Sequence, residues 1–164
     1  MTGQQDDIKH VAELVDRARI AMLTTMTREG KHESRPMALQ EVEFDGDLWF
    51  FVDRNSDVAA EVSENPQVNV AFSNDKHSEW TSIAGSASVL FDRAKAEELW
   101  SPAVKVWFPD GPDSPDLALL RVRAESAQYW ESPGGKLRQL IGAARAVVTR
   151  NPDAFPGETH EVSL

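Results

Sequence analysis

The chain has 164 residues and carries 17 Lys or Arg against 27 Asp or Glu, which gives a formal net charge of −10. Phosphate groups would repel such a surface, so the charge argues against nucleic-acid binding and against adsorption to an anionic membrane. Apolar residues make up 41% of the chain, enough for one folded domain, and the absence of cysteine excludes disulfides, thiolate catalysis and cysteine-based metal sites.

The first half of the chain is predicted to form a helix, three antiparallel strands joined by tight turns, a short helix and a fourth strand. Pro36 lies inside the second strand, which predicts a sheet edge or a bulge because proline has no amide hydrogen for the ladder. Ser56 or Asp57 is expected to cap the short helix, and Asn65-Pro66 ends it. The apolar spacing and turn residues place the long helix at 6–19, the strands at 20–27, 34–44, 48–53 and 68–74, and the turns at 28–31 and 45–47.

The second half contains a long strand, 80–92, that carries mostly small side chains on one face and has Gly85 in its middle. Small residues on a sheet face let a flat molecule or another backbone approach closely. A second long strand, 117–131, is expected to bend at Ala124-Glu125-Ser126. Helices are expected at 93–100, 102–107 and 136–148, a loop at 109–116 and a disordered tail at 151–164, which leaves residues 1–150 as a single domain.

Hairpins dominate this order of elements, and strands and helices do not alternate regularly. The pattern argues against Rossmann and TIM folds and predicts a mainly β protein, an antiparallel barrel with peripheral helices. The first thirty residues lack the basic start and the apolar run of a signal peptide, and no stretch approaches the length of a membrane span. We therefore expect a cytoplasmic protein.

Two arginines stand near the ends of the second and third predicted strands. Arg35 begins the second strand, and Arg54 follows the third at the mouth of the short helix that Ser56 can cap. If these strands pair as a hairpin, both guanidinium groups, the serine hydroxyl and the helix N-terminus converge, which is an arrangement that binds phosphate. The alternative is that both arginines pair only with Asp53, Asp57 or other acidic neighbours.

Three of the five tryptophans lie beside loops or at the ends of elements, where an aromatic ring can stack on a planar ligand. These three are Trp80, Trp107 and Trp130. His77 and Glu79 together provide too few ligands for a metal site, so no metal is expected.

At several of these residues the sequence resembles a known family. It is similar to the FMN-binding split-barrel proteins related to pyridoxamine 5′-phosphate oxidase, and within them to the general stress protein group. The matching stretches occur in family order between residues 11 and 148. They are SRPM (34–37), LWFFVDRNSD (48–57), ENPQVNVAFSN (64–74), WTSIAGSASV (80–89), ELWSPAVKVWFPDGPDSPDLALLRV (98–122) and AQYWESPGGK (127–136).

The resemblance implies a six-stranded antiparallel split β-barrel that works as a homodimer. It also implies two flavin mononucleotide (FMN) sites at the subunit interface, with FAD as the alternative flavin. Arg35 corresponds to the arginine that opens the family's phosphate-binding strand. Ser56 and the amide of Asp57 stand where the family holds the phosphate.

Other positions correspond to family residues around the flavin rings. Pro36 and Met37 would line the rings through backbone contacts, and Trp80 would reach them from the start of the next long strand. Residues of the second subunit would cover the site. The remaining implied positions are the facing strand end (Phe51, Val52, Asp53 and Arg54), the covering pair (Lys105 and Trp107) and Trp130, an aromatic near the flavin.

The chain departs from the oxidases at positions that bind phosphate and substrate. Asp57 and Val58 stand where the oxidases carry Arg-Lys, and a carboxylate beside a phosphate lowers affinity by like-charge repulsion. Gln40 replaces a lysine, and residues 136–138 read Lys-Leu-Arg where the oxidases carry the Arg-Leu-His set that grips pyridoxine. These differences argue against true pyridoxamine-phosphate oxidase activity and predict moderate flavin affinity.

The sequence leaves several functional interpretations open. The first is an FMN-dependent oxidoreductase whose flavin is reduced by a nicotinamide, with no side chain marked as an obligatory acid or base and with an unidentified small-molecule substrate. The second is a non-catalytic protein that binds or buffers FMN or FAD during stress. A dimer that has lost its cofactor, and the use of a deazaflavin or pyridoxal phosphate, are further alternatives.

Overall fold

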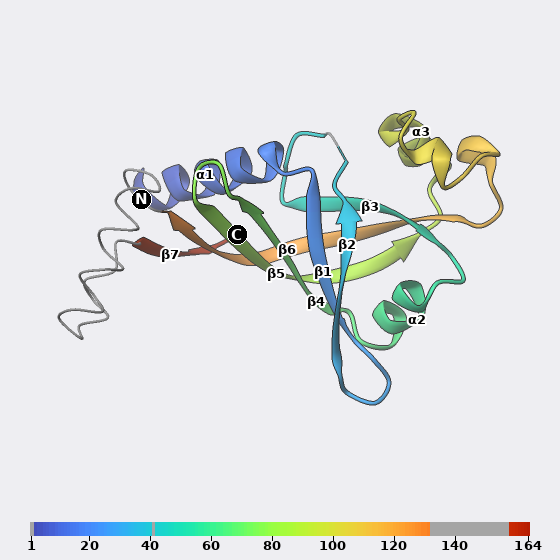
Figure 1. The fold of residues 1–164 in the computed structure, drawn as a ribbon, viewed down its shortest axis with the longest axis horizontal. Helices are drawn as coiled ribbons and strands as arrows, with labels where there is room; N and C mark the ends of the chain where they lie inside the picture. The colour runs from blue at the N-terminus through green and yellow to red at the C-terminus, as the bar shows by residue number, and fades with distance from the viewer. Residues whose placement is uncertain (1, 41, 132–157) are drawn as a thin grey trace.

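The computed structural model describes residues 2–40, 42–131 and 158–164, and these form a seven-stranded antiparallel sheet with helices around it (Figure 1). Six strands follow the order β2-β1-β4-β5-β6-β3, which confirms the predicted mainly β architecture, and β7 pairs with β6. The helix predicted at 136–148 lies outside the described residues. The elements are α1 (Thr2–Arg17), β1 (Ile20–Met26), β2 (His32–Ala38), β3 (Asp47–Asp53), α2 (Asp57–Glu64), β4 (Gln67–Asn74), β5 (Glu79–Leu90), α3 (Arg93–Leu99), the 3-10 helices η1 (Val104–Val106) and η2 (Gly111–Asp113), β6 (Leu117–Glu131) and β7 (Glu158–Ser163).

The hairpin predicted between the second and third strands is wrong. β2 pairs with β1 at one end of the strand order, whereas β3 pairs with β6 at the other end. β3 is apolar from Leu48 to Val52 and needs an apolar neighbour, which it finds where Phe50 pairs with Leu120. β2 cannot offer this, because most of its residues are exposed and it carries Pro36. The proline lies on an edge strand, as predicted.

β5 and β6 form the longest strand pair, and their register shifts at one point. Ala84 pairs with Ser126 but Gly85 pairs with Ala124, so Glu125 is the extra residue of a β-bulge. A bulge bends its strand and increases the local twist, which confirms the bend predicted at 124–126. The bend lets one half of β6 pair with β3 and the other half with β7.

The sheet wraps around a main hydrophobic core that α1 and α2 close. Val11 and Leu14 of α1 and Val58 and Val62 of α2 belong to this core. A smaller apolar cluster lies under α3 and η1, which stand at the opposite end of the sheet from β7 (Figure 1). Within the described ranges, no helix is both long and apolar enough to cross a bilayer.

The last residues form a strand, so the disordered tail predicted for 151–164 is wrong over β7. Val162 is 3% exposed and pairs with Ala127, and the ring of His160 stacks on Tyr129 with 4.8 Å between centroids. The strand was not predicted because it is short and contains a single apolar residue, Val162, and because the preceding residues include two prolines. Residues 151–157 lie outside the described part of the chain.

Candidate functional site

The outward face of the central strands is free of charged side chains along two neighbouring rows. Buried residues such as Leu23, Val70 and Ile83 alternate with these rows, which places the rows outside the core. Small residues dominate the β5 part of the face, as predicted. An uncharged face in a chain of net charge −10 is typical of a surface that another molecule covers. The rows are Pro36, Met22, Ala71, Ser82 and Gln128, and Ser34, Thr24, Asn69, Ala84 and Ser126.

Trp80 and Trp130 lie side by side on this same face, as cross-strand partners in β5 and β6. Trp80 is 41% exposed although it belongs to a strand. The sequence singled out both tryptophans but did not predict their pairing. Pro36 stands on the same face three strands away, which is roughly 14 Å at ordinary strand spacing. The face therefore places two aromatic rings beside a surface of mostly small, uncharged side chains, and this arrangement can bind a planar ligand.

Arg35 projects from the other face of β2 into a polar cluster beside α2. Its Nη1 donates to Thr25 Oγ1 at 2.9 Å and to Glu61 Oε2 at 3.0 Å, and its Nη2 donates to the same Glu61 oxygen at 3.1 Å. The Thr25 hydroxyl also donates to that oxygen, at 2.6 Å. The side chain of Glu61 is 12% exposed, so Arg35 pairs with a partly buried acidic neighbour, as the alternative interpretation predicted.

Arg54 has different partners and lies beside the ends of β5 and β6. Its guanidinium carbon stands 4.8 Å from the centroid of the Phe91 ring, and Nη1 donates to the Pro115 carbonyl at 3.4 Å. Arg35 and Arg54 therefore do not share the single anion site that the predicted hairpin would have created. The physical reason is that β3 pairs with β6 instead of β2.

The turn that leads into α2 is held by its own side chains. Ser56 Oγ accepts from the Ala59 amide at 3.3 Å and donates to the Asp53 carbonyl at 2.6 Å, which confirms Ser56 as the helix cap. Asp53 Oδ1 accepts from the Asn55 amide at 2.7 Å and so shapes the turn. The positive end of the helix dipole can attract an anion here, but exposed Asp57 in the first turn opposes one.

Three predicted residues pack their side chains into the protein interior. Phe51 meets Trp100 edge to face with 5.8 Å between centroids, Val52 is 5% exposed, and Met37 packs against the main core. Val52 can reach a ligand only through its backbone, whereas Met37 and Phe51 are partly buried. β2 and β3 both stand at ends of the strand order, so an outer backbone edge of each is turned away from the ladder.

Lys105 and Trp107 lie in and after η1 at the far end of the molecule. Trp107 is 81% exposed and its neighbour Val106 80%. Trp80 begins β5, whereas η1 follows the other end of that twelve-residue strand, roughly 40 Å along the chain direction. Within one chain, η1 therefore lies at the opposite end of β5 from Trp80.

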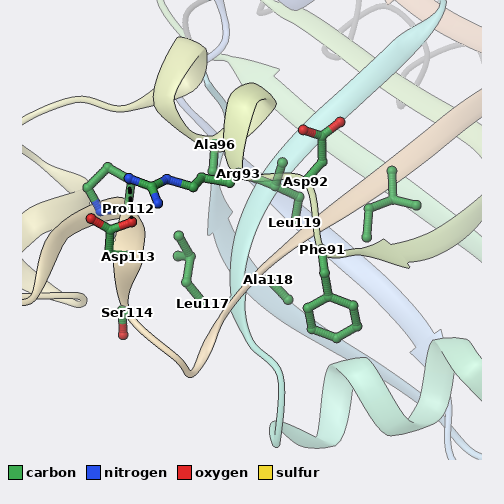
Figure 2. A pocket seen from close by; sticks show the side chains of 11 residues that line it. Phe91, Asp92, Arg93, Ala96, Pro112, Asp113, Ser114, Leu117, Ala118 and Leu119 are labelled. Carbon is green, nitrogen blue, oxygen red and sulfur yellow. Dashed lines mark ion pairs between the residues drawn. The ribbon is translucent and has the colours of Figure 1, made fainter.

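Two cavities open elsewhere on the described surface. One of about 320 Å³ lies between the end of β5, the start of β6 and η2, where Arg93 and Asp113 form a 2.8 Å ion pair (Figure 2). The other, of about 550 Å³, lies between α1 and the turn that joins β4 to β5. None of the predicted site residues lines either cavity. The candidate site is thus an open face and not an enclosed pocket.

A second arginine–glutamate pair stands on the solvent side of α2. Arg28 Nε donates to Glu64 Oε1 at 2.6 Å. The hydrogen bond from Arg28 lowers the pKa of Glu64, and the same bond raises the pKa of Arg28. Glu64 follows Glu61 by three residues, so α2 holds one exposed and one partly buried glutamate, each paired with an arginine.

The comparison with known families agrees with this geometry. The family model of pyridoxamine 5′-phosphate oxidase like proteins matches residues 6–153. The chain belongs to this family. The expected resemblance to the oxidase-related split barrels is therefore confirmed. Among curated proteins, Protein bli-3 of Neurospora crassa is 29% identical over 155 residues, which cover 88% of this chain and 74% of that protein.

Solved structures of general stress proteins show the same fold. The general stress FMN/FAD binding protein of Xanthomonas citri is 32% identical, with a TM-score of 0.67 over 78% of this chain and 93% of that one. A structure from Jannaschia sp. CCS1 assigned to general stress protein 26 is 26% identical, with a TM-score of 0.72 over 97% of this chain and 99% of that one. The chain is thus similar to general stress proteins, as expected.

The sequence did not predict two members of the polar cluster in this pyridoxamine 5′-phosphate oxidase-like protein. Thr25 follows Ala21 and Leu23 at two-residue spacing, so the strand period places its hydroxyl on the same buried face. Glu61 follows Asp57 by four residues and so lies on the same side of α2, one turn further on. The sequence indicates the face on which each residue lies. Their contact with Arg35 could be predicted only once the placement of α2 relative to β2 was known.

Proposed function

We propose that the chain is a dimeric flavin-binding protein of the general stress type, with FMN or FAD held between two copies. The uncharged outward face with its Trp80–Trp130 pair is the observation that carries this proposal. A second subunit can cover this face, and the two tryptophan rings can stack on a flavin. The general stress FMN/FAD binding protein of Xanthomonas citri, at 32% identity, supports the choice of ligand.

The residues present fit a flavin whose rings and phosphate meet different elements. The rings would lie against the Pro36 edge of β2, on the outward face that also carries the tryptophan pair, and the phosphate would approach Arg35 and the N-terminus of α2. Lys105 and Trp107 of the partner subunit would cover the rings, which accounts for a tryptophan that is 81% exposed in one copy. When bound, the flavin supplies hydride or electron transfer, and the chain supplies orientation and exclusion of water.

Two functions remain for such a site. An FMN-dependent oxidoreductase would pass a hydride from a nicotinamide to the flavin, and this needs no proton-transferring side chain at the rings. A flavin-binding or buffering protein would need only the site itself. Alanine, serine, proline and methionine dominate the outward face, and such residues move no proton at neutral pH, so the face is compatible with both.

Titration with FMN tests the flavin proposal directly. We expect one FMN per chain, quenched flavin fluorescence and an apparent Kd in the micromolar range, because tryptophan stacking adds affinity while Asp57 and Glu61 oppose the phosphate. The visible spectrum and the NADH- or NADPH-driven reduction rate, compared with free FMN, then separate the oxidoreductase from the buffering protein. Failure to bind FMN, FAD or riboflavin would remove the proposal.

Charge on the outward face tests the dimer. Met22 is 41% exposed within the uncharged rows, so Met22→Glu would place two carboxylates, one from each copy, in the proposed interface. We expect this variant to shift the dimer to monomers in sedimentation velocity and to lose FMN with it. Gln5→Glu, which adds the same charge on the exposed side of α1, is the matched control. Equal sedimentation of both variants would place the interface elsewhere.

A further inference from the structure

The donors of Arg35 that would best hold a phosphate are already bonded within the chain. Nη1 and Nη2 form the end of the guanidinium fork, and both donate to Glu61 Oε2, at 3.0 and 3.1 Å. A phosphate binds arginine most strongly through two parallel N–H bonds, one to each of two phosphate oxygens. Glu61 thus uses the same two nitrogens that a flavin phosphate would need.

This contact is well protected from water. The side chains of Arg35 and Glu61 are 22% and 12% exposed, and the hydroxyl that joins them belongs to Thr25, which is 1% exposed. One carboxylate oxygen accepts from two guanidinium nitrogens and one hydroxyl. Ion pairs in such partly buried surroundings are screened much less than surface pairs, so the Arg35–Glu61 contact opposes exchange of partners.

Other carboxylates near Arg35 also offset the positive charge that would attract a phosphate. Glu33 Oε2 lies 3.5 Å from Arg35 Nη2. Asp57 stands one helical turn before Glu61, at the end of α2 where the dipole would favour an anion. The single positive charge of Arg35 therefore faces more than one carboxylate.

We propose that Glu61 competes with the flavin phosphate for Arg35 and so makes the bound flavin exchangeable. The inference rests on the proposed function, since it takes the flavin site as given. Binding of FMN requires the phosphate to displace or share Arg35 with Glu61, whereas riboflavin, which has no phosphate, leaves the contact intact. The site consequently gains little from the phosphate and behaves as a carrier that takes up and releases flavin.

Glu61→Gln provides the test, because the amide keeps the shape and a hydrogen-bond acceptor for Thr25 but removes the charge. Glu64→Gln is the matched control, since it removes an equal charge from an Arg-paired glutamate on the same helix. FMN and riboflavin are titrated into the wild type and both variants, and FMN release is followed by stopped-flow fluorescence. Circular dichroism confirms that each variant is folded.

The expected result is that Glu61→Gln binds FMN roughly tenfold more tightly and releases it more slowly, on the scale of one charge-assisted hydrogen bond. Riboflavin affinity stays unchanged, and Glu64→Gln behaves as the wild type. If Glu61→Gln binds riboflavin normally but FMN no better or more weakly, Glu61 supports Arg35 and the competition is overturned alone. If no protein binds either flavin, the proposed function is overturned and this inference with it.

Discussion

Gly85→Ala is expected to destabilise the protein by about 3 kcal/mol, at the upper end of the usual cost of overpacking a core. A Cβ at this position would lie 2.4 Å from the Arg123 carbonyl oxygen and 3.0 Å from a methyl carbon of Val122. The first of these atoms is backbone in the strand ladder, so it cannot turn aside as a flexible side chain can. β5 and β6 would have to separate at the bulge that allows β6 to pair with three other strands.

Urea unfolding followed by tryptophan fluorescence measures this loss. Ser86→Ala is the matched control, because Ser86 is the next residue of β5 and lies on the outward face. We expect that control to change the free energy of unfolding by less than about 0.5 kcal/mol, as surface substitutions do. Equal stability of both variants would mean that the bulge relaxes to admit a methyl group.

Local patterns in the sequence predicted most elements because each depends on its own residues. Alternation along β4 and β5 marked their buried faces, and Ser56 marked the start of α2. The bend in β6 was predicted at 124–126, where the polar residues Glu125 and Ser126 stand side by side. These patterns involve residues close together in the sequence, so they predict an element without knowledge of the fold.

Strand partners could not be predicted in the same way. Adjacent strands pair often, which favoured a β2–β3 hairpin, but the apolar side chains of β3 needed the buried neighbour that β6 provides some seventy residues later. That single pairing error carried over to the site. It placed Arg54 beside Arg35, whereas Arg54 lies over Phe91 and Arg35 lies against Glu61.

The resemblance to the family assigned the candidate site to particular strands, but it could not describe the local electrostatics. Trp80 and Trp130 were each expected near a flavin, and the register makes them neighbours. The family pattern does not specify Glu61, whose carboxylate meets Arg35 only because α2 packs against β1, the partner strand of β2. Features that depend on contacts between distant segments are those that the sequence left open.

Arg35→Ala is expected to weaken FMN binding by about 2 kcal/mol, or roughly thirtyfold, within the range for hydrogen bonds to charged groups. The variant loses the guanidinium, and it also leaves the Glu61 carboxylate unpaired where the phosphate must approach. Arg54→Ala is expected to have a smaller effect, because Arg54 is engaged with Phe91 and the Pro115 carbonyl. Isothermal titration with FMN and riboflavin measures both variants.

Two comparisons make this prediction specific to Arg35. Arg28→Ala removes an arginine that pairs with Glu64 on the exposed side of α2, so it controls for the loss of positive charge and should leave the FMN affinity unchanged. Arg35→Lys keeps the charge but not the fork, and an intermediate loss is expected because lysine cannot bond a phosphate bidentately. A riboflavin affinity that falls together with the FMN affinity would assign Arg35 to the fold and not to the phosphate. Equal FMN affinities for the wild type and Arg35→Ala would place the phosphate away from α2 altogether.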